Sequence, residues 1–374
     1  MKTGIVTFHN AYNYGAVLQA YALQETLATL GHEASIVDYW RPYDLRAARS
    51  LFRRGTQFRV MVENLAVFAS YFQWKRRYAR FNQFRQEYLN LTEGRYTSDQ
   101  ELVENPPPCE AFVCGSDQVW NVSSGIDPVF FLNFAKTLGK KRVSYGPSFR
   151  VPEIPKRYRD RCRELMLDIP WLSAREQLGS EMIKELTGRD AQTVVDPVLL
   201  LSADEWKKRI PPPRQPRSPY LFVYAVRTRR LMNTMIRALK KKTGLPVIVA
   251  TGDSPVNRVG IPADKVYLDA GPKEFLELAM GATCVCTSSF HGTAFALVFR
   301  QPVYVFPQTT TAGDPRMTNL MQRVGMERYL VESEDYTLPE NPLEIDYESP
   351  GRALEGLRQQ SLDYLRDAMA APAP

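Results

Sequence analysis

The sequence predicts an α/β protein with two doubly wound, Rossmann-like domains built on parallel sheets. The chain has 374 residues, and a single hydrophobic core stops growing at roughly 250–300 residues. Strand-like and helix-like segments alternate in both halves, which is typical of parallel sheets joined by crossover helices. Between the halves, residues 211–219 hold five prolines in nine residues, which neither a helix nor a central strand tolerates. We therefore expect a linker at 211–219.

The first domain is placed at 1–210. A β-rich run at 3–8 is followed by a Gly/Asn turn, by an apolar stretch of helical period at 16–30 and by a second strand at 34–39. This strand–helix–strand order predicts a βαβ unit, and βαβ units imply a parallel sheet. Further strands are expected at 111–114, 142–145 and 193–196.

Residues 45–90 of this domain are predicted to form a basic helical insertion. From Arg41 to Arg85 there are eleven basic residues and two acidic ones. The simpler interpretation is a solvent-exposed helical face. The alternative is peripheral association with an anionic membrane, because each Lys or Arg near such a surface contributes roughly 1 kcal/mol. The hydrophobic residues that could anchor the segment in the membrane are Leu51, Phe52, Phe58, Val60, Phe68, Tyr71, Phe72, Trp74 and Phe81. If the segment binds anionic vesicles, replacing the basic residues by Glu should weaken that binding, and the residues to replace are Arg53, Arg54, Arg76 and Arg77.

The second domain is placed at 220–350, where the alternation starts again. Strands are expected at 220–226, 246–250, 284–286 and 303–306, and helices at 231–242, 273–279 and 294–299. A C-terminal helix is expected at 351–369 and a disordered tail at 370–374. Ligands of open parallel sheets bind at the carboxyl ends of the strands. Two such sheets therefore place the ligand in the cleft between them.

Composition excludes several classes of protein. With 44% hydrophobic and 24% charged residues, the chain is too apolar for intrinsic disorder. Its longest apolar runs fall well short of the roughly 20 residues that span a bilayer, and polar residues interrupt the N-terminal run before a secretory signal forms. The five cysteines have neither zinc-site nor disulfide spacing and are expected to be buried. We expect a cytoplasmic protein, with the inner membrane face as the alternative location, and no nucleic-acid partner and no metal.

His291 is the first candidate for chemistry. It follows the expected strand at 284–286 through a Ser/Ser turn that leads into a helix. Backbone N–H groups and the helix dipole favour an anion at such a junction, and an imidazole beside an anion is a suitable general acid. The alternative is a histidine that only caps the helix. Ser288 and Ser289 are by themselves typical N-cap residues.

The matching junction of the first domain contains Asn13, Tyr14 and Gly15, among hydroxyl and amide groups that could recognise a sugar. Gly15 would permit close approach of the backbone. A tight turn whose polar groups satisfy the local backbone is the alternative.

A second polar cluster follows the expected strand at 111–114 and contains Asp117, Gln118 and Trp120. Asp117 could accept a proton from an acceptor hydroxyl or could cap a helix. Arg175–Glu176 is interpreted as an internal ion pair and Asp196–Pro197 as a turn at a strand end.

Five segments taken together resemble the polysaccharide pyruvyl transferase family, and they occur in the family's order. They are residues 12–23, 114–121, 172–176, 195–200 and 287–293. The resemblance extends from about Thr3 to about Val331 and implies a GT-B-like fold. It also implies phosphoenolpyruvate as the donor substrate, no cofactor, and a pyruvate added as a ketal to a sugar of a glycan or lipid-linked precursor.

The resemblance assigns roles to residues, with the acceptor on the first domain and the donor on the second. His291 matches the family's catalytic histidine, and Asp117 is the second catalytic candidate. The donor-binding candidates are Ser288, Ser289, Gly292, Thr293, Arg227 and Arg316. The acceptor-binding candidates are Asn13, Tyr14, Gly15, Gln118 and Trp120.

Ser289 departs from the family pattern, because other members carry Arg two residues before the histidine. Ser cannot replace the charge of a guanidinium group. We expect Arg227, Arg300 or Arg316 to supply that charge, with Arg316 as the first choice. Two alternatives stay open: a GT-B-type glycosyltransferase with a nucleotide-sugar donor, and a non-catalytic protein that binds anions or glycans.

Overall fold

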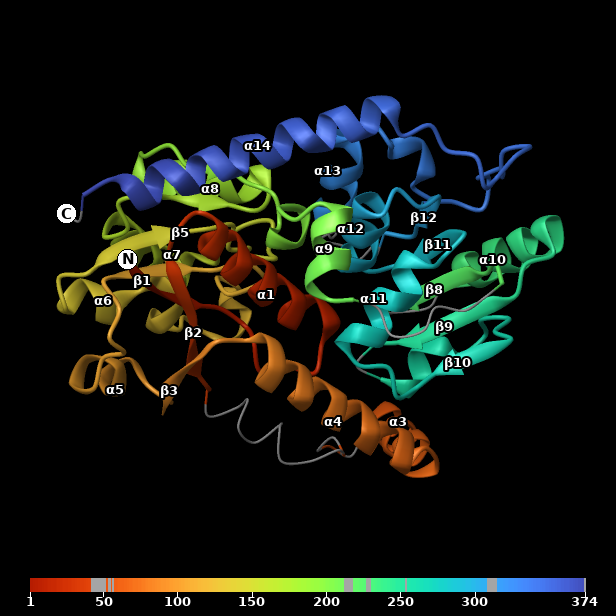
Figure 1. Ribbon diagram of the computed structural model, residues 1–374, viewed down its shortest axis with the longest axis horizontal. Coiled ribbons are helices and arrows are strands. Elements are labelled where there is room, and N and C mark those ends of the chain that lie inside the picture. Colours follow the sequence, from red (N-terminus) through yellow and green to blue (C-terminus); the bar gives the residue numbers. More distant parts are fainter. Residues whose placement is uncertain are drawn as a thin grey trace.

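The chain folds into two halves, each built on a five-stranded parallel sheet (Figure 1). The computed structural model describes residues 1–41, 52, 55, 57–211, 218–226, 230–252, 254–307 and 315–372. The first sheet has the order β3-β2-β1-β4-β5 and the second the order β10-β9-β8-β11-β12. This is the same doubly wound order twice, so the predicted fold class is confirmed.

The first sheet consists of β1 (Lys2–Val6), β2 (Glu33–Tyr39), β3 (Leu91–Tyr96), β4 (Ala111–Cys114) and β5 (Lys141–Ser144). Its helices are α1 (Tyr14–Thr29), α3 (Phe58–Ala69), α4 (Tyr71–Tyr88), α5 (Asp99–Glu104), α6 (Asn133–Thr137), α7 (Lys156–Leu167), α8 (Gln177–Thr187) and α9 (Ala203–Arg209). Shorter elements are β6 (Ser173–Ala174), β7 (Gln192–Thr193) and the 3₁₀ turns η1 (Val122–Ser124), η2 (Pro128–Phe131) and η3 (Pro197–Leu199).

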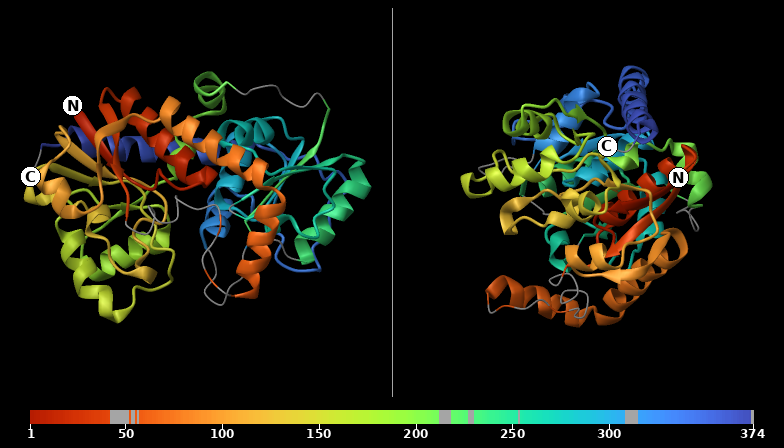
Figure 2. Two further views of the ribbon diagram at one scale, coloured as in Figure 1. Left: turned by 90° about the horizontal axis from the view of Figure 1, so that it is seen from below. Right: turned by 90° about the vertical axis from the view of Figure 1, so that its left-hand side faces the viewer.

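The second sheet consists of β8 (Leu221–Ala225), β9 (Val247–Thr251), β10 (Lys265–Tyr267), β11 (Cys284–Thr287) and β12 (Val303–Val305). Its helices are α10 (Arg230–Thr243), α11 (Pro272–Met280), α12 (Phe290–Val298), α13 (Pro315–Arg323) and α14 (Glu348–Ala370), with the 3₁₀ turns η4 (Pro255–Arg258) and η5 (Glu327–Tyr329). Figure 2 shows the two halves side by side, with helices packed around each sheet.

The central strands are apolar on both faces because both faces are covered. In the first half, Ile5 and Ile36 contribute to one hydrophobic core and their neighbours Val6 and Val37 to the other. The register places Ile5 beside Ile36 on β2 and beside Val113 on β4. All five cysteines are free and buried, as expected.

The structure corrects some of the predicted elements. The expected strand at 193–196 reduces to the two residues of β7, which pairs with β6 outside the main sheet. Neither β3 nor β10 was predicted, and both are edge strands whose residues are largely exposed or half-buried. The helix expected at 294–299 begins at Phe290, so His291 belongs to its first turn.

In the described part of the basic insertion, α3 and α4 meet at Ser70. Residues 42–51, 53, 54 and 56 lie outside the described residues, and so do residues 212–217 of the predicted linker at 211–219. Helix α4 holds the two halves together. Its fully buried Arg77 donates to the carbonyl of Ala270 at 2.9 Å and to the hydroxyl of Tyr14.

The C-terminal helix α14 is longer than predicted and returns to the first half. At its start, Tyr347 donates to the carbonyl of Gln301 at 2.6 Å. Near its end, Tyr364 donates to the carbonyl of Ser144 at 2.9 Å. The helix therefore bridges the two halves along one side of the molecule (Figure 1). Of the predicted disordered tail, 373–374 lie outside the described residues.

Candidate active site between the two sheets

The switch points of the two sheets carry the predicted site residues. In the first sheet the order reverses between β1 and β4, which lead into α1 and into the segment of Asp117. In the second sheet it reverses between β8 and β11, and β11 leads into α12 with His291. Loops at switch points form the crevice in which doubly wound folds bind ligands. The turn η3 packs against both α1 and α12, so the two junctions lie close together.

His291 is held in the first turn of α12 by its neighbours. The side chain of Ser289 caps the helix, accepting from the N–H of Gly292 at 3.4 Å. Gly292 must lack a side chain, because a Cβ there would lie 2.2 Å from the hydroxyl of Thr287. These contacts fix the direction of the His291 ring, which is only 8% exposed.

The first half presses directly against that ring. A Cβ placed on Gly15 would lie 2.0 Å from Nδ1 of His291, far inside van der Waals contact. Gly15 is thus the residue that lets the first turn of α1 approach the imidazole. The predicted close approach at Gly15 occurs, and what approaches is a side chain of the other half.

Asp196 faces His291 from the first half. Its Oδ2 lies 3.5 Å from Nε2 of His291 and 2.7 Å from Nη1 of Arg175. The carboxylate is completely buried, and its other oxygen accepts from the N–H of Val198 at 3.1 Å. At 3.5 Å the His291 contact is a close charge pair and not an aligned hydrogen bond, and Nε2 finds no hydrogen-bond partner among the described residues.

Asp196 is ionised despite its burial. Burial alone would raise its pKa, but His291, Arg175 and the Val198 N–H outweigh it and hold the pKa well below its ordinary value. The carboxylate therefore keeps its negative charge beside the His291 imidazole, in a site largely closed to water.

Arg175 holds the carboxylate of Asp196 in an ion pair. Its Nε lies 3.0 Å from a carboxylate oxygen of Glu176, and its guanidinium lies over the ring of Phe290 at 4.6 Å. Burial alone would lower the pKa of Arg175, but Glu176 and Asp196 raise it above its usual value. Its Nη2 is buried without a hydrogen-bond partner among the described residues. Nη2 of this permanently charged group can thus donate to a ligand or a water.

Arg316 comes to the same place from α13. Its guanidinium lies 5.9 Å from the centre of the Phe290 ring, the ring on which Arg175 also lies. With the Gln118 amide turned so that its oxygen faces Arg316, that oxygen accepts from both terminal nitrogens of Arg316, at 2.8 and 3.1 Å. The structure therefore joins a predicted donor-binding residue to a predicted acceptor-binding residue.

Asp117 adopts a left-handed backbone conformation with φ of 73°, which is uncommon for a residue with a side chain. Its carbonyl accepts from the N–H of Ser148 at 2.8 Å, which holds the backbone there. The carboxylate also raises the pKa of Arg175, which places Asp117 in the same electrostatic cluster. Strained backbone of this kind is concentrated at functional sites.

Several predicted binding residues have structural contacts instead of open positions. Ser288 accepts from the N–H of Val226 at 3.2 Å, and Thr293 donates to the carbonyl of Ser289 at 3.1 Å. Asn13 caps α1 by accepting from the N–H of Ala16 at 3.2 Å. These side chains shape the two junctions.

The two aromatic acceptor candidates are buried away from the cleft. Tyr14 is stacked on Phe275 at 4.4 Å, and its hydroxyl donates to Ala270. Trp120 is fully buried and donates to the carbonyl of Phe130. Neither ring is brought to His291 in this structure.

The structure describes only one of the two remaining arginine candidates. Arg227 lies outside the described residues. Arg300 follows the opposite end of α12 from His291 and packs near Gly351 at the start of α14. Arg316 is thus the member of the predicted trio that the structure places beside His291.

Arg175 and Asp196 are functional candidates that the sequence interpretation treated as structural. A lone Arg–Glu pair and an Asp–Pro turn are common, and nothing local says that they meet His291. The usable signal was that both lie in segments of the family resemblance. A second His–carboxylate pair was also missed: Nε2 of His9 lies 3.0 Å from Asp38, buried near the carboxyl ends of β1 and β2.

Two doubly wound halves with a cluster of charged residues and a histidine buried between them define a two-domain α/β protein with a candidate active site between its halves. The family model described as polysaccharide pyruvyl transferase matches residues 13–309. The chain belongs to the polysaccharide pyruvyl transferase family, which makes it a transferase enzyme. No curated protein gives a significant match to the sequence.

Among solved structures, the chain is similar to three sugar-nucleotide and glycosyl enzymes. The UDP-GlcNAc 2-epimerase from Methanocaldococcus jannaschii is 11% identical, with a TM-score of 0.47 and coverage of 95% of this chain and 92% of that one. The calicheamicin glycosyltransferase is 14% identical, with a TM-score of 0.45 and coverage of 100% and 99%. The glycosyltransferase SnogD from Streptomyces nogalater is 15% identical, with a TM-score of 0.42 and coverage of 99% and 98%.

Proposed function

We propose that this transferase moves pyruvate from phosphoenolpyruvate to two hydroxyls of one sugar in a surface polysaccharide precursor, forming a ketal. Family membership supports the pyruvyl group. The observation that carries the chemistry is the contact between the His291 imidazole and the ionised, arginine-held carboxylate of Asp196 at 3.5 Å. It provides a proton donor in a buried cleft, and the donor's enol needs one.

The reaction begins with proton transfer from His291 to the methylene carbon of phosphoenolpyruvate. That carbon becomes a methyl group, and the adjacent carbon becomes electrophilic. One sugar hydroxyl adds to it and loses its proton, which passes to the phosphate as the C–O bond to phosphate breaks. The second hydroxyl then adds and loses its proton, which restores the proton that His291 gave up. Asp117 is the proposed base for the hydroxyl protons, and general acid–base catalysis of this kind contributes about 10²–10⁴ in rate.

Two guanidinium groups of the site can bind the anionic donor. They belong to Arg175 and Arg316, among the carboxyl groups of Asp117, Glu176 and Asp196. The donor relies on Arg316 and on the unpartnered Nη2 of Arg175, because charge-assisted hydrogen bonds are the strong ones.

Arg175 and Arg316 also supply positive charge that Ser289 lacks in comparison with the family's Arg. The Ser289 hydroxyl is used as the α12 cap and brings no positive charge. Two guanidinium groups nevertheless lie on the Phe290 ring beside His291. The non-catalytic alternative rests on Ser289 alone, so a turnover measurement decides between the two.

The test uses the purified protein, phosphoenolpyruvate and the lipid-linked sugar fraction of a strain from which the gene has been deleted. We expect phosphate release that depends on the sugar fraction, and acid-labile pyruvate on the glycan by mass spectrometry. The same fraction with a panel of nucleotide sugars is the control. Nucleotide release without phosphoenolpyruvate consumption would replace the proposal by a glycosyltransferase, and donor binding without turnover would favour the non-catalytic alternative.

A further inference from the structure

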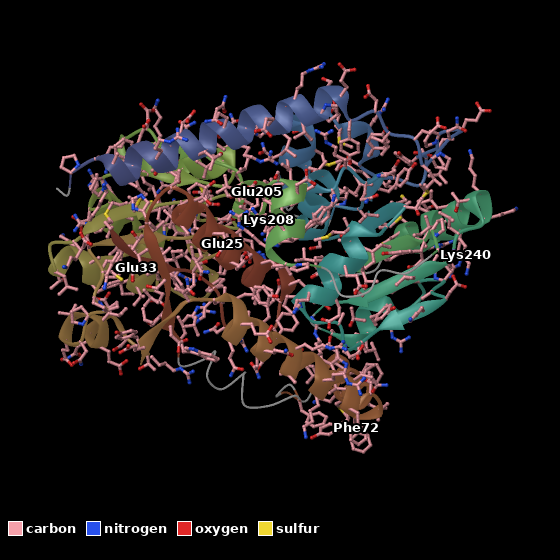
Figure 3. The ribbon with its side chains drawn as sticks, viewed as in Figure 1. Glu25, Glu33, Phe72, Glu205, Lys208 and Lys240 are labelled. Atoms are coloured by element: carbon pink, nitrogen blue, oxygen red, sulfur yellow. The ribbon has the colours of Figure 1, made fainter. Side chains whose placement is uncertain are left out.

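The helix α3 exposes its apolar side to solvent. Six large hydrophobic side chains along it and at the start of α4 are between 41% and 83% exposed: Phe58, Met61, Val62, Leu65, Phe68 and Phe72. We call this set the α3 face. Figure 3 shows Phe72 at the tip of the α3–α4 unit, pointing away from the body of the protein.

Five members of the α3 face lie on one side of α3. Phe58, Met61, Val62 and Leu65 follow the i, i+3, i+4, i+7 spacing of a single helix side, and Phe68 continues it. Phe72 follows in α4, just beyond Ser70. The opposite side of the helix is the one that packs, with Glu63 and Val67 buried and with η4 as a neighbour. Exposed apolar stripes of this extent mark interaction sites in soluble proteins.

The segment that carries the α3 face is positively charged. From 57 to 80 the only acidic residue is Glu63, and it is 2% exposed. Lys75 and Arg76 are exposed just beyond Phe72, and Arg76 pairs with Asp269 of the second half at 3.3 Å. The wider sequence from Arg41 to Arg85 has eleven basic and two acidic residues.

This combination fits an anionic lipid surface better than a second copy of the chain. A two-fold pairing through the same face would bring its excess positive charge against itself. A helix with an apolar side flanked by cations lies in the plane of an anionic bilayer surface. None of the helices in the described ranges is long and apolar enough to cross a membrane, so contact at the surface is the relevant mode.

We propose that the α3 face inserts into the interfacial layer of an anionic membrane and holds the protein there reversibly. This surface does not include His291 or its partners, and its binding is independent of the proposed reaction.

The structure also changes which residues take part. Trp74, Arg77 and Phe81, counted among the anchors and cations from sequence, are buried. Arg77 bonds across the two halves, so its reversal to Glu would damage the fold. Leu51, Arg53 and Arg54 lie outside the described residues.

The test is co-sedimentation of the full chain with vesicles of phosphatidylglycerol and phosphatidylcholine, and with vesicles of phosphatidylcholine alone. We expect binding to the anionic vesicles that weakens as salt is raised, because surface charges are screened. Replacing Leu65, Phe68 and Phe72 together by Ser is expected to reduce binding by about tenfold or more, since affinity scales with buried apolar area. Lys75→Glu is expected to reduce it less.

Leu167→Ser is the matched control. Leu167 is a 41% exposed hydrophobic residue at the end of α7, outside the α3 face, and its replacement is expected to leave vesicle binding unchanged. Thermal unfolding of each variant shows that the fold is retained. Equal binding to neutral vesicles, or none to either, would overturn the proposal. The proposal would also be overturned if the parent protein bound no vesicles but formed a dimer in sedimentation velocity, and if the triple variant did not form that dimer.

Discussion

The first turns of α1 and α12 lie against each other between the two halves. Their local structures are alike, but their roles in the candidate site differ. Both α1 and α12 follow a central strand, both begin with a capping side chain, and both have glycine in the first turn. In α12 that glycine packs on Thr287 and leaves His291 facing the cleft. In α1 the glycine is the empty space into which His291 fits. The start of α12 thus carries His291, and the start of α1 leaves the space that the His291 ring occupies.

The charged residues next to His291 come from neither of these two helix starts. Asp196 and Arg175 belong to the segments around β6, β7 and η3 of the first half. A repeated fold therefore positions the site, while residues outside the repeat set its electrostatics. The variants below separate these contributions, from the largest expected effect to the smallest.

His291→Ala removes the proton donor. We expect the rate of phosphate release to fall by about 10²–10⁴, the usual contribution of a general acid, with little change in the unfolding temperature. Asp196 keeps Arg175 as its partner in this variant, so no buried charge is left alone. A near-wild-type rate would remove His291 from the mechanism.

Gly15→Ala tests whether the space on α1 is required. The added methyl group must displace either the imidazole or the helix start, and a displacement of about 1 Å can cost about 10² in rate. Gly356→Ala is the control, because a Cβ at Gly356 meets nothing within 4 Å. Initial rates of the two variants should differ by one to two orders of magnitude. If they are equal, the contact between Gly15 and His291 has no part in turnover.

Asp196→Asn tests whether the negative charge that faces His291 is required. The substitution keeps the shape of the side chain and removes the charge 3.5 Å from Nε2 of His291, so the rate is expected to fall by about tenfold or more near neutral pH. Glu176→Gln is the matched control, since Glu176 also pairs with Arg175. An equal loss of rate in both variants would show that the charges around Arg175, and not the contact of Asp196 with His291, are what turnover needs.

Asp196 also predicts how stability depends on pH. Its folded pKa lies below its unfolded value, so its stabilising contribution is present above the ordinary Asp pKa of about 3.9 and is lost as the pH falls below it. Urea unfolding midpoints between neutral and acid pH measure this loss, which should be smaller in Asp196→Asn.

Arg316→Ala gives the smallest expected effect on chemistry and acts on donor binding. We expect the KM for phosphoenolpyruvate to rise by about tenfold, with a smaller change in kcat. Arg300→Ala, at the far end of α12, should leave both constants unchanged. Equal donor KM values in the two variants would mean that another cation holds the donor.

The sequence predicted the parts of the fold that alternate clearly and are buried on both faces. It also predicted His291, because a short polar turn between a β-rich run and an apolar helix is visible locally. The edge strands β3 and β10 were missed because their exposed residues lack an apolar run. The Arg175–Asp196–His291 arrangement was missed because it depends on residues 21 and 95 positions from Asp196 being brought together by the fold.

Tyr14 and Trp120 were acceptor-binding candidates because they stand among polar residues, and the structure buries both rings. Sequence neighbours do not show which side of a turn faces solvent. Here the hydrophobic area of the rings decided their position.

The bridge formed by α14 constrains how the cleft can admit a ligand. His291 is nearly covered, so substrates need the halves to part. A helix of 23 residues is a strut about 35 Å long, attached to one half at Tyr347 and to the other near Tyr364. Figure 1 places it on the side of the molecule opposite α4. Separation with α14 attached is therefore a rotation about the α14 side, and it breaks the contacts that α4 makes with the second half, those of Arg77 with Ala270 and of Arg80 with Asp269.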